Sequence, residues 1–406
     1  MKLLQLNTRL SKSEFQSLKW ITASLALVLL YQTYHSYASD RMMLIWDILI
    51  IFTGAFGCYS FLVRHPLKGY SRWAIWLILY FVLAGMMYGN SIMSGSNLSI
   101  VLEQDLRYVM LVLMGAIFAS SSQMMSAFHW LMKWLAVISI LFGVLGIVNF
   151  DFVASIIAER KGTWTMSYYY WWASTTCFSY WGYYFLFMKR QKILGCGVFL
   201  TYLALGALFV KRAVLVDGLV VLFCYFLFNK GNKIGTAFKV VIVAVFALSM
   251  VYFMSPRLFN TITDSYSTRI EAAQDAENLD RNEEASAYLE NATTFQLILG
   301  NGIGHYPRIV GYREYDYQIN AIHIGWANII YKGGILYSLF YILIILQVIK
   351  KAFSSKLNSY EKVCLGVSIS MLISLLYEGS WTYTMDPVCK FAPLFYLLSN
   401  NQDEFV

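Results

Sequence analysis

The chain has 406 residues, of which 58% are hydrophobic and only 13% are charged. This is far more apolar than a soluble domain of ordinary composition, so a single water-soluble core is excluded. The formal net charge of +8 is spread along the chain rather than gathered in one patch, which argues against nucleic-acid binding.

Apolar stretches of about 20 residues recur along the chain, and each reaches across a hydrocarbon layer ~30 Å thick at ~1.5 Å per residue. Aromatic residues gather near their ends, where amphipathic rings favour the headgroup level. The sequence therefore predicts an all-α, polytopic membrane protein with about twelve transmembrane helices. The expected spans lie near residues 20–38, 42–63, 73–90, 106–121, 127–149, 168–188, 193–210, 213–229, 238–255, 321–349, 363–380 and 387–400.

The distribution of cations sets the expected orientation. With the N-terminus inside, 18 Lys and Arg residues fall on cytoplasmic segments and about six on the short outer turns, as the positive-inside rule requires. Both termini are then cytoplasmic. The chain divides into nine spans in 1–255, one large outer loop at 256–320, and three spans with a cytoplasmic tail in 321–406. All six cysteines fall within expected spans without metal-type spacing, so no metal or cofactor is expected.

The outer loop is acidic and is expected to be hydrated, since it holds ten of the 23 carboxylates. Its carboxylate clusters fit a solvated face better than a cation site. All five of its cations are arginine, at positions 257, 269, 281, 308 and 313. Two interpretations stay open: translocated loops are poor in lysine, or planar guanidinium groups bind phosphate or carboxylate.

Two local patterns stand out within the loop. Residues 268–271, Thr-Arg-Ile-Glu, match a capping box ahead of a helix that continues to about Asn291. Arg269 then lies in a first helical turn, where its charge adds to the anion site of a helix N-terminus. Further on, residues 300–304 form a Gly-x-Gly-x-Gly turn that lets the backbone approach a ligand or another helix closely. Without a βαβ context this is no dinucleotide fingerprint.

Cations and imidazoles at the outer boundary are the candidates for chemistry. Arg212, in a tight outer turn, either snorkels to the headgroups or clamps a phosphate. Arg160 and Lys161 form a second outer cluster, which is either a solvated pair or part of the same site. His323 opens the tenth span; it is either a packed histidine or a base, and His305 competes for that role.

Five charges lie deep within expected spans, where ionisable groups pair or line water-filled paths. The sequence does not pair them, and they keep a proton-coupled transporter open as an alternative. They are Asp47, Asp217, Lys332, Glu378 and Lys390.

Four stretches, in chain order, resemble motifs of the bacterial O-antigen polymerase and O-antigen ligase superfamily. They are Arg160–Trp164, similar to an outer Arg-x-x-Gly-aromatic stretch; Phe209–Ala213, similar to Ser/Thr-x-Ser-Arg-Gly/Ala; Ser267–Ala273, similar to a loop arginine that opens a helix; and Gly300–Gly304 with His323 and Gly334, similar to the closing region. The chain departs from these motifs in details: the first glycine comes one position early, the second stretch lacks hydroxyl residues, and Ile324 and Tyr337 replace an asparagine and a glycine.

The resemblance implies a glycosyltransferase of the bacterial cytoplasmic membrane, acting at the outer leaflet without metal or cofactor and with inversion. It would polymerise oligosaccharide repeat units carried on polyprenyl pyrophosphate. Its partners would be this lipid-linked oligosaccharide, the bilayer, and chain-length regulator and flippase proteins. A ligase that transfers the glycan to lipid A core is the alternative within the superfamily, and a lipid-linked sugar flippase is the alternative outside it.

The resemblance also implies roles for individual residues. Arginines can stabilise the charge that grows on a pyrophosphate leaving group, and a neutral imidazole can accept the proton of the attacking sugar hydroxyl. The implied catalytic residues are Arg212, Arg269 and His323. The implied substrate-binding residues are Arg160, Lys161, Trp164, Arg281 and His305.

Overall fold

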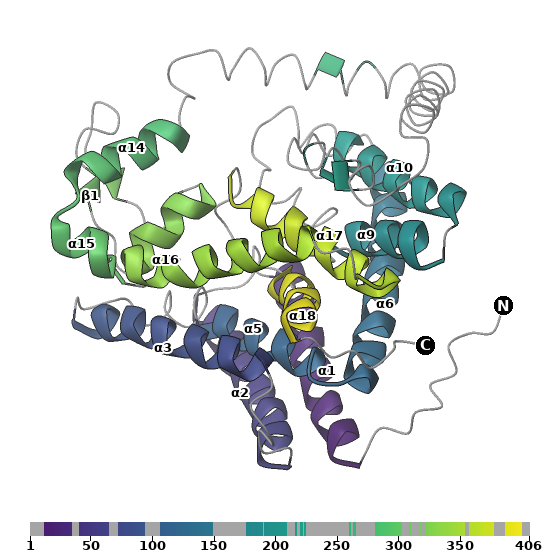
Figure 1. Cartoon of the computed structure of the whole chain (residues 1–406), viewed down its shortest axis with the longest axis horizontal. Helices are drawn as coiled ribbons and strands as arrows, with labels where there is room; N and C mark the ends of the chain where they lie inside the picture. The colour runs from purple at the N-terminus through teal and green to yellow at the C-terminus, as the bar shows by residue number, and fades with distance from the viewer. Residues whose placement is uncertain are drawn as a thin grey trace. The chain divides into compact units, whose positions relative to one another are not determined.

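The fold is that of a computed structural model of the chain (Figure 1). The described residues are 12–34, 40–64, 72–93, 106–148, 176–189, 191–208, 216, 220–221, 223–224, 260, 263–264, 281–302, 308–309, 317–318, 322, 324–353, 357–376 and 386–399. Among them lie twelve α-helices, one π-helix and two strands of two residues each, so the predicted all-α class is confirmed. This number is not a number of spans, because two of the helices belong to the expected outer loop.

The chain forms two compact units, one made of residues 1–134 and 281–406, the other of residues 135–280. The elements of the first unit are α1 (Lys12–Tyr34), α2 (Asp40–Arg64), α3 (Arg72–Met93), α5 (Arg107–Phe118), the beginning of α6 (Ser122–Val148), α14 (Arg281–Asn291), α15 (Thr294–Leu299), β1 (Arg308–Ile309), β2 (Tyr317–Gln318), α16 (Gly325–Ala352), α17 (Ser359–Ser374) and α18 (Asp386–Ser399). The two strands pair antiparallel.

Within the part of the chain that the structure describes, three helices are long and apolar enough to cross a membrane. They contain the stretches Leu44–Val63 in α2, Ser122–Leu141 in α6 and Gly325–Ala352, which is the whole of α16. Each overlaps an expected span: 42–63, 127–149 and 321–349, respectively. The described part of the chain thus bears out the membrane prediction for these three, and the full set of about twelve spans stays a prediction.

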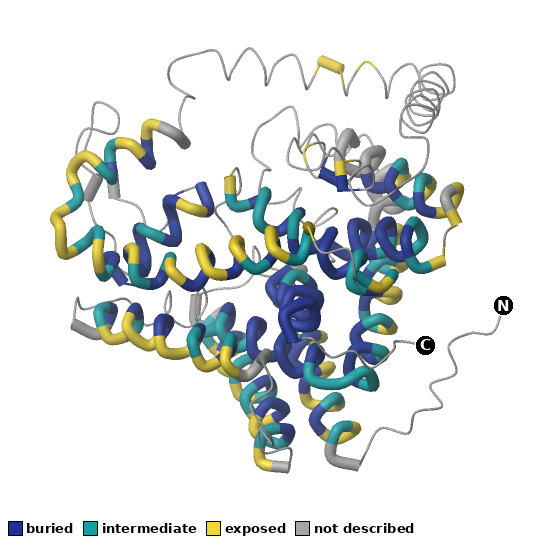
Figure 2. Tube along the Cα trace, viewed as in Figure 1, coloured by how far each residue is buried: buried dark blue, intermediate teal, exposed yellow. Residues whose placement is uncertain are grey.

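Large apolar side chains face outward along these helices and along α3. Figure 2 shows exposed positions recurring along α2, α3 and α16. On α16 they are Trp326, Ile335, Leu339, Ile342, Leu343, Ile345, Leu346 and Ile349. A continuous apolar surface of this kind is costly in water and is what a helix bordering lipid requires.

Two short helices form the centre of the first unit. Ten of the twelve residues of α5 are buried, and in α18 every residue except Lys390 is buried. The two helices pack closely because Gly115 of α5 leaves room: a Cβ there would lie 3.0 Å from the Cβ of Phe391. Because their described residues are almost all covered by protein, they form a core rather than lipid-facing helices.

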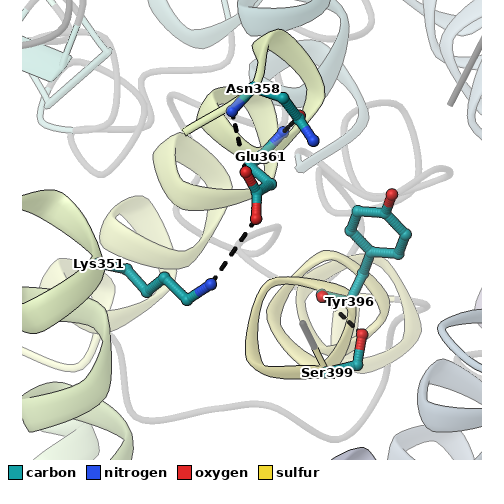
Figure 3. Close-up of polar contacts among 5 residues, drawn as sticks. All are labelled: Lys351, Asn358, Glu361, Tyr396 and Ser399. Atoms are coloured by element: carbon teal, nitrogen blue, oxygen red, sulfur yellow. Dashed lines mark hydrogen bonds and ion pairs between the residues drawn. The ribbon is translucent and has the colours of Figure 1, made fainter. Parts of the chain in front are cut away.

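Polar contacts among Lys351, Asn358 and Glu361 connect the end of α16 to the beginning of α17 (Figure 3). Asn358 and Glu361 form a reciprocal capping box: the Asn358 backbone N–H donates to Glu361 Oε2 at 2.9 Å, and the Glu361 N–H donates to Asn358 Oδ1 at 2.7 Å. Glu361 Oε1 also lies 3.7 Å from Lys351 Nζ, in the last turn of α16. One carboxylate therefore both caps α17 and holds the end of α16.

Replacing Glu361 should separate these two roles. Glu361→Gln can keep the capping box and loses only the partly exposed ion pair, so we expect a cost below about 1 kcal/mol. Glu361→Ala loses both and should cost about 1 kcal/mol more. Thermal unfolding in detergent measures the difference, and equal melting temperatures for the two variants would show that the cap contributes nothing.

The second unit contains α9 (Thr176–Tyr183), the π-helical turn η2 (Tyr184–Met188) and α10 (Lys192–Leu208). Aromatic rings hold these elements together: Phe178 stacks on Tyr202 with centroids 5.6 Å apart, and Phe199 fills the space left by Gly182. The expected aromatic-rich span at 168–188 is thus helical from Thr176 onward, the part of it that the structure describes.

Candidate functional site

Most of the residues that the sequence singled out lie outside the described residues. These are Arg160, Lys161, Trp164, Arg212, Arg269, His305 and His323, together with the capping box at 268–271. Arg281 is the first residue of α14, and its side chain is also outside what the structure describes. The predicted end of the loop helix near Asn291 is confirmed, since α14 ends there. The described contacts in this region are those among α14, α15, the turn Gly300–Gly302 and α16.

Helix α16 is broken at Gly334. This residue has φ 65° and ψ −170°, a conformation open essentially only to glycine, and it divides α16 into residues 325–333 and 335–352. A break of this kind removes intrahelical partners from the carbonyl groups of the preceding turn. In a membrane span those carbonyls must bond to other protein groups.

The turn Gly300–Gly302 supplies these partners. The backbone N–H of Asn301 donates to the carbonyl of Tyr331 at 2.8 Å, and that of Gly302 donates to the carbonyl of Lys332 at 2.9 Å. Gly300 and Gly302 have φ of 75° and 76°, and a Cβ at Gly302 would lie 2.7 Å from the backbone nitrogen of Ser91. Of the two readings of this glycine turn, close approach to another helix is the one that the structure supports.

Asn301 is the centre of a hydrogen-bond network that joins four helices. Its Nδ2 donates to the Tyr288 hydroxyl of α14 at 3.1 Å and to the Tyr331 carbonyl of α16 at 3.2 Å. Its Oδ1 accepts from Gln296 Nε2 of α15 at 2.9 Å. Asn90 of α3 completes the network by donating to the Gly300 carbonyl at 2.6 Å. The sequence reading missed Asn301, although its place between two spaced glycines is a recognisable signal.

Helix α14 packs its apolar face on the first half of α16. Buried residues from both helices and from the segment just before α16 form one cluster, consisting of Ala285, Tyr288, Ile322, Ile324, Ala327 and Tyr331. The rings of Tyr288 and Tyr331 meet edge to face with centroids 5.0 Å apart. The Ile322 N–H donates to Asn328 Oδ1 at 3.0 Å. Both described neighbours of His323 are therefore buried and held in place.

The Tyr288 phenol should make stability depend on pH. Burial raises its pKa to about 12, against the opposing hydrogen bond from Asn301. In the unfolded chain the phenol pKa is about 10. The neutral phenol therefore adds to the free energy of unfolding in full below pH 10, and this stabilisation is lost as the pH rises toward 12. Glu284 and Tyr331, which interact electrostatically, face the same cluster. We expect the melting temperature of the wild type to fall more steeply above pH 10 than that of Tyr288→Phe; parallel curves would contradict this.

Asp47, one of the deep charges, forms an ion pair with Arg107. Asp47 Oδ1 of α2 lies 3.0 Å from Arg107 Nη1 of α5, and these side chains are 1% and 0% exposed. The guanidinium group also lies over the Tyr31 ring of α1, with its carbon 4.4 Å from the centroid. This pair therefore ties three helices together and has the features of a structural contact. Lys332 and Lys390 lie in α16 and α18, whereas Asp217 and Glu378 are outside the described residues.

Tyrosine hydroxyls form a second polar feature in the interior. Tyr108 of α5 and Tyr341 of α16 have their hydroxyl oxygens 3.3 Å apart. Tyr80 of α3 packs beside them against Phe340, with ring centroids 5.1 Å apart. These contacts bind α3, α5 and α16 into one body. The sequence offered no signal for them, because these tyrosines are a few among 30.

No known protein family matches this chain, and no curated protein or solved structure matches it.

Proposed function

We propose that the chain is a membrane glycosyltransferase that polymerises oligosaccharide repeat units carried on polyprenyl pyrophosphate. The observation that carries the proposal is the contact between Gly300 and Gly334. The resemblance groups these two glycines in one closing region, and a Cβ at Gly334 would lie 2.6 Å from the Gly300 nitrogen. The shared order of four motifs and the three apolar helices give further support.

The proposed reaction inverts the anomeric carbon of the donor sugar. The acceptor hydroxyl attacks this carbon, the bond to the pyrophosphate oxygen breaks, and the electron pair leaves with the diphosphate. Arg212 and Arg269 stabilise that charge, and His323 takes the proton of the hydroxyl. Arg160, Lys161, Trp164, Arg281 and His305 bind the donor. Transfer of this kind needs charge stabilisation rather than protonation of the leaving group, which guanidinium groups provide.

The scaffold around α16 supports this proposal in one respect. A catalytic base is effective when its supporting residues are fixed by packing and hydrogen bonds. Ile322 and Ile324, the neighbours of the proposed base, are buried in the cluster shared with α14. Gly302, three residues before His305, is fixed in the same way, because its backbone N–H donates to the Lys332 carbonyl.

The proposal is tested with purified protein in nanodiscs supplied with lipid-linked repeat units. Arg212→Ala, Arg269→Ala and His323→Ala should each slow chain extension by about a hundredfold or more, the usual effect of losing a charge-stabilising or proton-accepting group. Lys350→Ala, an exposed cation at the far end of α16, is the matched control and should extend chains normally. Normal extension by all three test variants would reject the mechanism.

The ligase is separated from the polymerase by the acceptor. Deleting the gene should leave single repeats on the carrier lipid if the chain polymerises them. Long glycans that stay on the carrier lipid and never reach lipid A core would identify a ligase instead.

A transporter of lipid-linked sugars is the second candidate, favoured by the break in α16. Discontinuous spanning helices are common at transporter substrate sites, where free helix ends bind ions or substrate. Here the carbonyls of Tyr331 and Lys332 already accept hydrogen bonds from the Gly300–Gly302 turn. In sealed vesicles, movement of labelled lipid-linked sugar across the bilayer without any new glycosidic bond would establish transport.

A further inference from the structure

Helix α15 turns apolar side chains outward, although it lies in the stretch expected to be a hydrated loop. None of its six residues is buried; Phe295 is 57% exposed and Ile298 is 44% exposed. These two side chains are three residues apart and therefore share a face. An exposed apolar pair on an acidic, water-facing loop calls for an explanation.

The amide side chain of α15 does not make this face polar. Gln296 is engaged at both ends within the protein: its Nε2 donates to Asn301 Oδ1 at 2.9 Å, and its Oε1 accepts from the Thr293 backbone N–H at 2.8 Å. The Thr293 hydroxyl in turn accepts from the Gln296 N–H at 3.3 Å. Phe295 and Ile298 are therefore the large side chains of the outward surface, with the exposed Thr294 beside them at the first residue of α15.

The docking of α15 on α16 places it below the membrane surface. Lys350 and Lys351 end α16, and cations of this kind mark the interface on their side. Residues 335–349 then cover about 22 Å of a hydrocarbon layer ~30 Å thick. Gly334 lies roughly 8 Å inside the opposite surface by this measure. The carbonyl of Ile298 contacts Gly334 directly, so α15 lies at the same depth.

The exposed face of α15 continues the lipid-facing surface of its neighbours. Ile335, the residue after the break in α16, is 50% exposed. Met86, one turn before Asn90 on α3, is also exposed, and Asn90 donates to Gly300 directly after α15. Helix α14, by contrast, carries polar residues on its exposed side, at Glu283, Ser286 and Glu290. The chain thus passes from a helix with a polar exposed side to one with large apolar side chains exposed.

Irregular backbone is tolerated at this depth only where protein groups satisfy it. The turn after α15 meets this condition. The N–H groups of Gly300, Asn301 and Gly302 donate to the carbonyls of Gln296, Tyr331 and Lys332. The Gly300 carbonyl accepts from Asn90.

We propose that α15 is a re-entrant helix whose Phe295 and Ile298 side chains enter the hydrocarbon layer and contact lipid chains. This goes beyond the proposed function and is independent of it, since a transporter or a scaffold protein can hold the same helix. The occupant of the surface is the hydrocarbon of the bilayer, because the surface is continuous with the lipid-facing sides of α3 and α16.

Photo-crosslinking in nanodiscs of a single phospholipid tests the proposal. Phe295 is replaced by p-benzoyl-phenylalanine, which preserves an aromatic side chain, and Ser286 on the exposed side of α14 is the matched control. After irradiation, mass spectrometry should find a phospholipid adduct at position 295 and none at 286. An adduct between position 295 and the protein itself, or the absence of a lipid adduct there, would overturn the proposal.

Thiol accessibility gives a second measurement that does not depend on the bulky label. Ile298→Cys and Glu290→Cys are compared for reaction with a membrane-impermeant maleimide, and the wild type, with its six native cysteines, sets the background. Since a thiolate must form in water before it reacts, labelling at 298 should be at least about tenfold slower than at 290. Equal rates would show that α15 is in water. Unfolding the protein in detergent should make both positions reactive.

Discussion

Gly334→Ala is expected to lower the melting temperature of the protein by roughly 6 to 12 °C, the equivalent of about 3 kcal/mol for a unit of this size. Two costs combine. The conformation at φ 65°, ψ −170° costs a residue with a side chain about 1–3 kcal/mol. The added Cβ would also overlap the backbone carbonyl of Ile298, which cannot move without displacing α15.

The matched control is Gly89→Ala on α3. A Cβ at Gly89 meets no atom within 4 Å, so alanine should be neutral or should stabilise the helix by up to about 1 kcal/mol. Fluorescence-detected size-exclusion chromatography after heating reports both variants. If Gly334→Ala has the same melting temperature as the wild type, α16 can straighten without a loss of stability, and the fold does not require the break.

Asp47→Ala should destabilise the first unit by about 3–5 kcal/mol, because it leaves the guanidinium group of Arg107 buried without its carboxylate. The Tyr31 ring offers Arg107 only a weaker partner, of about 0.5–2 kcal/mol. Unlike this interior pair, the partly exposed pair of Lys351 and Glu361 should cost less than about 1 kcal/mol when broken by Lys351→Ala.

The double variant Asp47→Leu with Arg107→Leu decides whether the pair is structural. Replacing both members of a buried ion pair by apolar residues is commonly neutral or stabilising. We therefore expect the double variant to recover most of the melting temperature lost in Asp47→Ala. Recovered stability together with lost chain extension would instead assign the pair a part in the chemistry, and stability lost as fully as in Asp47→Ala would mean that leucine cannot pack there.

Helix positions were predictable from the sequence because apolar length decides them. The span expected at 42–63 is α2 at Asp40–Arg64, and the one at 73–90 is α3 at Arg72–Met93. Local spacing also predicts helix N-caps: Thr293 and Gln296 have the spacing of a capping box, and they form one at the start of α15.

Contacts between distant residues were not predictable in this way. Asp47 and Arg107 are 60 residues apart, and nothing in either local sequence identifies the other. The same holds for Asn301 and Tyr331, which meet only because Gly334 breaks α16. Composition likewise gave no sign of the exposed apolar pair Phe295 and Ile298, since the ten carboxylates of the loop outweigh two residues in any average.

The arrangement of α5 and α18 sets an order of events during biosynthesis. The first helix leaves the ribosome roughly 270 residues before the second, which at about 5–20 residues per second amounts to some 13 to 54 seconds. Throughout that interval the part of α5 that packs on α18 around Gly115 has no partner from its own chain, whereas its contacts with α2 can already form. The nascent protein therefore depends on an insertase or on bulk lipid to shelter that surface, and a chain that stops short of Asp386 is a natural substrate for quality-control proteolysis.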